Sequence, residues 1–173
     1  MDMKEKARKS MNWFERVLHK IPGFKGYYEK EFRRDADRLQ REFIVTKLQG
    51  IKESLNQVIQ NVSRQKNLAL LTEYDLFAKS LQKTTNEIRY ADQGYSGFFD
   101  LIKIGEDELD MVYEQDALIL ETTNSFREEF KGLADCPLEP SRLSPLRERL
   151  EQIDKLFKQR SALLKGYVKG DTK

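Results

Sequence analysis

Apolar residues recur at helical spacing from the start of the chain. Within residues 1–21 they fall three and four positions apart, and Pro22 and Gly23 follow directly. Because this spacing places side chains on one face of an α-helix, and proline cannot continue the helix, the pattern predicts an amphipathic N-terminal helix that ends before Pro22. Its apolar positions are Met3, Ala7, Met11, Phe14, Val17, Leu18 and Ile21.

A second helical pattern extends from about Tyr27 to about Arg64. It contains two apolar stripes whose phases differ, and Gly50 lies where the phase shifts. Such a shift predicts either a bend or a stutter in the packing of one long helix. The first stripe comprises Phe32, Ala36, Leu39 and Phe43, and the second comprises Ile51, Leu55, Val58 and Val62.

Three further helices are predicted, over about 68–91, over about 105–131, and from Ser144 and Pro145 onward. The helix over 105–131 has two apolar lines, which is typical of a central helix with several neighbours. The expected core residues are Leu70, Tyr74, Phe77, Leu81 and Ile88 in the first, Leu109, Val112, Tyr113, Ile119, Leu120 and Phe126 in the second, and Leu146, Leu150, Ile153, Phe157 and Leu164 in the third.

These patterns together predict an all-α fold, an antiparallel helical bundle of four main helices with an N-terminal amphipathic helix. The expected organisation is the amphipathic helix at 1–21, the bundle at 22–166 and a flexible tail at 167–173. Only four prolines and nine glycines occur in 173 residues, fewer than the turns of an all-β fold would require.

The single cysteine, Cys136, cannot form a disulfide within the chain, which favours a reducing compartment. No apolar run approaches the ~20 residues of a membrane span, and the basic N-terminus lacks the apolar core of a signal peptide. A cytoplasmic protein is therefore expected, with a location at the inner face of the membrane as one version of that expectation.

Charge is distributed unevenly although the net charge is only +2. Residues 1–41 contain twelve basic and seven acidic residues. Residues 105–130 contain one basic and nine acidic residues, and residues 142–173 contain nine basic and four acidic residues. An acidic helix between basic helices of one bundle explains this pattern, and a surface that binds a partner is the alternative.

Catalytic constellations are scarce in this sequence. One histidine, His19, and one cysteine cannot supply a zinc site or a nucleophile–histidine pair without distant partners, and no Glu-x-x-His pair or phosphate-binding glycine loop occurs. We therefore predict no catalytic residue, no metal and no cofactor.

Asp116 is the one acidic residue that stands out. It falls between Tyr113 and Leu120 on an apolar line of the helix over 105–131. Because a buried carboxylate needs a partner, we predict a buried ion pair, with Arg89 as the candidate cation. A structural pair is favoured over a functional acid.

The N-terminal helix carries the main functional hypothesis. Trp13 and Phe14 lie near its middle among basic residues, a composition typical of helices that lie in a membrane interface or bind a partner. Packing of its apolar face on the bundle is the alternative. The predicted contact residues are Trp13, Phe14, Arg8, Lys9, Arg16 and Lys20.

A second basic stretch, Lys25–Arg41, raises nucleic acid as a partner because aromatic residues interleave with its cations. Four acids dilute it, and acids such as Asp37 lie four positions before an arginine, here Arg41. A salt-bridged exposed helix face explains this arrangement better, so nucleic-acid binding is predicted to be absent.

The aromatic segment that follows the third helix is too apolar for an ordinary solvated loop. We expect it to form a turn that closes one end of the bundle, with glycines where the chain reverses. Its structural residues are Gly94, Tyr95, Gly97, Phe98 and Phe99. An enzyme site around Tyr95, Ser96, Asp100 and Asp116 is the weakest of the functional alternatives.

The segment Ile21–Arg38, which begins Ile-Pro-Gly-Phe-Lys-Gly, resembles the start of small, uncharacterised bacterial helical proteins. The segment Arg89–Asp100, which contains Gly-Tyr-Ser-Gly-Phe-Phe-Asp, is similar to a second block of those proteins. The resemblance implies a bacterial cytoplasmic origin and transfers no activity. The sequence thus predicts a non-enzymatic helical interaction or scaffold protein, membrane-peripheral through residues 1–21, or alternatively a self-associating bundle that binds protein without lipid contact.

Overall fold

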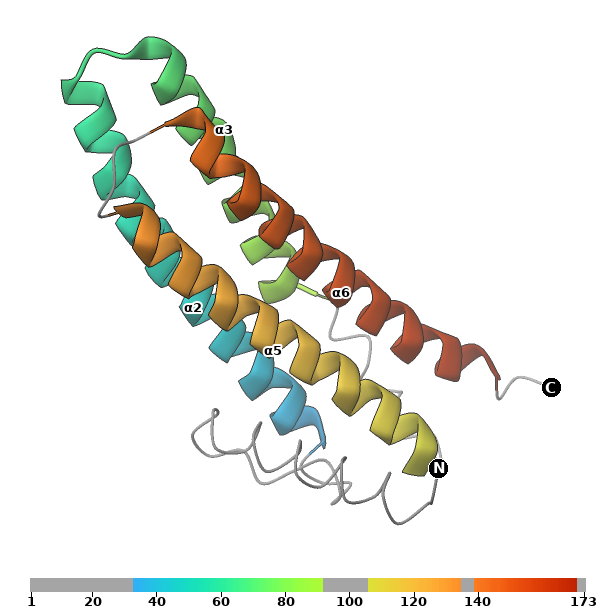
Figure 1. Cartoon of the computed structure of the whole chain (residues 1–173). Helices are drawn as coiled ribbons and strands as arrows, with labels where there is room; N and C mark the ends of the chain where they lie inside the picture. Colours follow the sequence, from blue (N-terminus) through green and yellow to red (C-terminus); the bar gives the residue numbers. More distant parts are fainter. Residues whose placement is uncertain (1–32, 92–105, 135–138, 171–173) are drawn as a thin grey trace. The chain divides into compact units, whose positions relative to one another are not determined.

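The computed structural model describes residues 33–91, 106–134 and 139–170, and these residues form an all-α helical bundle, as the sequence predicts. Four helices pack against one another, and no strand occurs in the described ranges (Figure 1). They are α2 (Arg33–Arg64), α3 (Leu68–Arg89), α5 (Glu106–Ala134) and α6 (Leu143–Gly170), and a short 3-10 helix, η3 (Pro140–Arg142), precedes α6.

The chain divides into two compact units. Unit 1 comprises residues 1–43, 92–120 and 156–173, and unit 2 comprises residues 44–91 and 121–155. Parts of α2, α5 and α6 therefore belong to each unit, whereas α3 belongs to unit 2 alone.

Unit 2 has an apolar core in which the expected residues are buried. The predicted seam of α3 and the second stripe of α2 are at most 5% exposed. The rings of Phe77 on α3 and Phe126 on α5 meet edge to face, with centroids 6.3 Å apart and planes at 78°. The buried apolar residues of these two seams are Ile51, Leu55, Val58, Val62, Leu70, Tyr74, Phe77, Leu81 and Ile88.

α2 passes through Gly50 as one continuous helix, and the expected stutter is present in its burial pattern. Along most of α2, the spacing between successive buried positions alternates between three and four residues. Between Gln40 and Leu48 two spacings of four occur in succession, with Ile44 between them, and this break in the alternation is the stutter. The first stripe was predicted wrongly at Leu39 and Phe43, which are only half-buried, and the burial of its other two members lies outside the described residues. The buried positions of α2 are Asp37, Gln40, Ile44, Val45, Leu48, Ile51, Leu55, Val58 and Val62.

The connection from α2 to α3 is a tight turn. Lys66 has a φ of 58°, the left-handed conformation that side chains with a Cβ adopt at a cost, and its amide donates to the Ser63 carbonyl at 3.1 Å. Asn67 then caps α3, because its Oδ1 accepts a hydrogen bond from the Leu70 amide at 3.1 Å.

Lys66→Gly is expected to raise the free energy of unfolding by about 0.5–1 kcal/mol, because glycine adopts the left-handed conformation without the Cβ penalty. Urea unfolding followed by circular dichroism measures this difference. Lys66→Val is the control and is expected to destabilise the protein, since a β-branched residue fits a positive φ poorly. A glycine variant less stable than the wild type would contradict the explanation.

α6 begins at Leu143, after η3, one residue before the expected cap at Ser144. Its predicted seam is confirmed for Leu146, Leu150, Ile153 and Phe157, which are all buried. The helix continues to Gly170, so residues 167–170, which the sequence assigned to the tail, are helical.

Several predictions fall on residues outside the described ranges. These are the amphipathic helix at 1–21 with its contact residues, the boundary at residue 22, the turn from Gly94 to Phe99, and Cys136. Among the helices that the structure does describe, none has an apolar stretch long enough to cross a lipid bilayer.

Candidate functional site

Four polar side chains come together in the interior of unit 1. Asp37 and Gln40 lie one turn apart on α2, Asp116 lies on α5, and Arg160 lies on α6. Each is at most 4% exposed, so all four have left water on folding. Burial of this kind is unfavourable unless the groups satisfy one another.

Arg160 joins the three helices through its guanidinium group. Its Nε donates a short hydrogen bond to Oδ1 of Asp116, and its Nη2 lies 2.7 Å from Oδ1 of Asp37. The Nη2 contact is a charge contact and lacks the direction of a good hydrogen bond. The side chain of Gln40 also donates to the Asp116 carboxylate. One arginine therefore holds a carboxylate from each of two other helices.

Arg41 completes the cluster at its rim. Its Nε and Nη2 each lie 2.9 Å from Oδ2 of Asp37, and its side chain is 14% exposed. The cluster thus contains two carboxylates and two guanidinium groups and is electrically neutral. The sequence predicted this pair between Asp37 and Arg41, four residues apart. It also predicted that the pair lies on an exposed helix face, and this was wrong for Asp37, which is 4% exposed.

Burial raises the pKa of Asp116 above its ordinary value of 3.8, and the charge and hydrogen bond of Arg160 oppose this shift. The folded protein therefore binds more protons at this carboxyl than the unfolded chain does, at pH values between 3.8 and the raised pKa. The contribution of Asp116 to stability accordingly increases as the pH falls through that window.

The free energy of unfolding of the wild type, minus that of Asp116→Asn, is expected to increase as the pH falls from 7 to 4. The asparagine variant cannot take up the proton that favours the folded wild type at lower pH. Urea unfolding at several pH values measures the difference, and subtraction of the two proteins cancels the carboxyl groups that do not interact with Asp116. A difference that is constant or that shrinks toward pH 4 would show that Asp116 keeps its charge throughout.

The structure confirms that Asp116 is buried and corrects its partner. The cation is Arg160 of unit 1, and Arg89, the candidate from the sequence, belongs to unit 2. Arg160 occupies the next position of the α6 seam. Phe157 follows Ile153 by four residues and Arg160 follows Phe157 by three, which continues the spacing of the seam. Asp37 and Gln40 likewise continue the α2 seam back from Ile44. A search for polar residues at seam positions would have found them.

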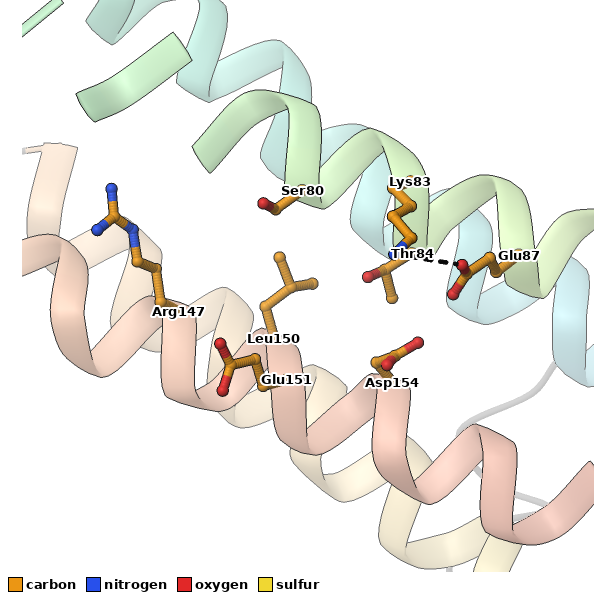
Figure 2. A pocket seen from close by; sticks show the side chains of 8 residues that line it. All are labelled: Ser80, Lys83, Thr84, Glu87, Arg147, Leu150, Glu151 and Asp154. Atoms are coloured by element: carbon orange, nitrogen blue, oxygen red, sulfur yellow. Dashed lines mark ion pairs between the residues drawn. The ribbon is translucent and has the colours of Figure 1, made fainter. Parts of the chain in front are cut away.

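A shallow groove of about 190 Å³ lies in unit 2 between α3 and α6 (Figure 2). Its lining combines hydroxyl groups, carboxylates and two cations, with the side chain of Leu150 at its floor. Ser80, Lys83, Thr84 and Glu87 come from α3, and Arg147, Leu150, Glu151 and Asp154 come from α6.

Large apolar side chains also lie exposed on the helices. On α5 in unit 1, Met111 is 45% exposed and Leu118 is 48% exposed. On α3 in unit 2, Leu68 is 76% exposed and Leu76 is 50% exposed. Met111 and Leu118 are seven residues apart, so they lie on one line of the helix surface two turns from each other.

Comparison with protein-family models, with curated proteins and with solved structures finds no match to this chain. Within the described ranges, no group of three or more histidine, cysteine, aspartate and glutamate side chains is placed to hold a metal ion.

Proposed function

We propose that this protein is a non-enzymatic helical interaction or scaffold protein. The observation that carries the proposal is the exposed line of Met111 and Leu118 on α5. The opposite face of that helix is buried through Tyr113, Asp116 and Leu120. Two large apolar side chains at heptad spacing are the pattern with which one helix packs on another. A partner helix that covers them would remove their apolar surface from water.

The arrangement of the buried charges supports a structural role for the interior. The carboxylates of Asp37 and Asp116 are bound to Arg160, and all three side chains are at most 5% exposed. A substrate cannot reach a group that is enclosed in this way, so the cluster orders the helices and performs no catalysis.

The double variant Met111→Glu/Leu118→Glu tests this proposal. We expect it to keep the helical content of the wild type but to lose the partners, or the self-association, of the full chain. Sedimentation equilibrium over a range of concentrations measures self-association, and cross-linking followed by quantitative mass spectrometry measures partners. Leu68→Glu/Leu76→Glu, which places the same two charges at exposed apolar sites on α3, is the matched control. Identical masses and identical partners for all three proteins would refute the proposal.

A membrane-peripheral version of this function rests on the sequence of residues 1–21, where Trp13 and Phe14 lie among Arg8, Lys9, Arg16 and Lys20. It predicts that the full chain pellets with anionic liposomes and that a chain lacking residues 1–20 does not. Equal pelleting of both proteins, or pelleting of neither, would leave the self-associating bundle without lipid contact as the better alternative. For both versions the proposed location is the cytoplasm, because the single cysteine favours a reducing compartment.

A further inference from the structure

We propose that residues 1–21 of this chain dock on the exposed line of α5 in unit 1 and cover Met111 and Leu118. The inference rests on the proposed function, because it names what occupies the line while no outside partner is bound. The segment covers the line in the free protein and leaves it when an outside partner or a membrane binds.

The docking surface combines apolar and acidic side chains. Met111, Glu114 and Leu118 follow one another at spacings of three and four, so they share one face of α5. Met111 is 45% exposed and Leu118 is 48% exposed, and Glu114 is also exposed and makes no ion pair with a residue that the structure describes. The part of α5 in unit 1 contains five acidic residues besides the buried Asp116, and no basic residue. The line therefore suits an occupant that combines an apolar face with cations.

The acidic residues argue against an anionic membrane as the occupant of this line. Anionic headgroups repel carboxylates and bind helices whose polar face is rich in lysine and arginine. The carboxylate of Glu114, at the centre of the line, would have to approach headgroups of its own charge and lose water. A basic peptide segment instead gains an ion pair at the same place.

Residues 1–21 have the complementary composition. They contain six basic and three acidic residues, and their apolar positions follow a helical period. Phe14 and Ile21 are seven residues apart, the same spacing as in the exposed line of α5. In a helix, Lys4 and Arg8 lie one turn apart at the border of the apolar face. Two helices with apolar residues at a seven-residue spacing can pack along a common seam.

The connection to α2 is long enough for docking within one chain. Eleven residues, 22–32, separate the segment from the start of α2 at Arg33. An extended chain of that length reaches up to about 36 Å, several times the ~10 Å diameter of a helix. Asp37 on α2 and Asp116 on α5 lie against the same guanidinium group, that of Arg160. The start of α2 is therefore close to the level of the line on α5, and the segment can fold back onto it.

Docking couples the two versions of the proposed function. The apolar face of residues 1–21 either covers α5 or enters a membrane interface, so the two states exclude each other. Binding of the segment to lipid exposes the line to a protein partner. In the docked state a partner must first displace the segment, which lowers its apparent affinity in proportion to the undocked fraction.

Fluorescence of Trp13 in the full chain tests the docking, because Trp13 is the single tryptophan and lies within the segment. For the wild type we expect the emission of a partly buried indole and weak quenching by acrylamide. Met111→Glu/Leu118→Glu is expected to weaken docking at least about tenfold, which moves the emission to longer wavelength and increases the quenching. Leu68→Glu/Leu76→Glu, with the same two charges at exposed apolar sites on α3, is expected to leave both signals unchanged.

A charge reversal tests the electrostatic contribution without altering an apolar residue. Glu114→Lys is expected to weaken docking about fivefold and to move the Trp13 emission in the same direction by a smaller amount. Glu148→Lys is the matched control, because Glu148 is also exposed but lies on α6 in unit 2. We expect its emission to equal that of the wild type.

Three outcomes would overturn the proposal. The first is the emission of a fully exposed indole in the wild type, and the second is the same emission in the wild type and in Met111→Glu/Leu118→Glu. The third is an emission that shifts on dilution of the wild type, which would place the segment on a second copy of the chain. Trp13 reports docking alone, whereas sedimentation and mass spectrometry report self-association and partners, so docking and the proposed function can fail separately.

Discussion

Arg160→Ala is expected to lower the free energy of unfolding by about 3–5 kcal/mol. The substitution leaves the carboxylates of Asp37 and Asp116 in the interior of unit 1 without the guanidinium group that lies against both of them. Arg41 reaches only Asp37, so it cannot replace Arg160 beside Asp116. Urea unfolding monitored by circular dichroism measures the loss, and hydrogen exchange is expected to place it in unit 1.

Arg149→Ala is the matched control for this prediction. Arg149 also lies on α6 and pairs with Glu129 at 2.6 Å, but the two side chains are 33% and 36% exposed. Because exposed pairs contribute little, its loss is expected to cost at most about 1 kcal/mol. Similar costs for the two alanine variants would contradict the burial argument.

A triple replacement separates the cost of breaking the cluster from its net contribution. Asp37→Leu/Asp116→Leu/Arg160→Met removes both buried carboxylates and the shared guanidinium together, so no charge among the three remains unpaired. We expect stability equal to or greater than that of the wild type, because apolar replacements avoid the cost of removing charges from water. A triple variant as unstable as Arg160→Ala would mean that the ion pairs themselves stabilise the fold strongly.

Phe77→Ala is expected to lower the free energy of unfolding by about 3–5 kcal/mol through loss of buried apolar surface and the cavity that remains. Phe77 has no exposed surface and meets Phe126 edge to face in the core of unit 2. Leu76→Ala provides a control one residue away on the same helix, where the side chain is 50% exposed. Its expected cost is below about 1 kcal/mol, measured by the same urea titrations. Equal costs at the two positions would place Phe77 outside the core.

The helices themselves were largely predictable from the sequence. The seam of α3, from Leu70 through Phe77 to Ile88, is buried as expected, and so is the α6 seam from Leu146 to Phe157. Apolar residues at a helical period define a buried face through local geometry alone, whatever the helix packs against. The stutter in α2 was visible for the same reason.

The errors occurred where polar residues occupy buried positions. The prediction that Leu39 and Phe43 face the core assumed that the most apolar stripe is the buried one. In α2 the buried face instead carries Asp37 and Gln40, because the structure gives them partners on α5 and α6. Hydrophobic periodicity contains no information about such compensation.

The sequence by itself determined that the chain forms amphipathic helices, which apolar residues of α3 and α6 form the buried seams, and that Asp116 lies on a buried line. Only the tertiary structure decided that Asp116 pairs with Arg160, that Asp37 joins them, and that Thr84 points into a groove between α3 and α6. Periodicity specifies the direction of each side chain around its own helix axis. The axial register between helices decides which residues meet, and that register follows from packing of the whole bundle.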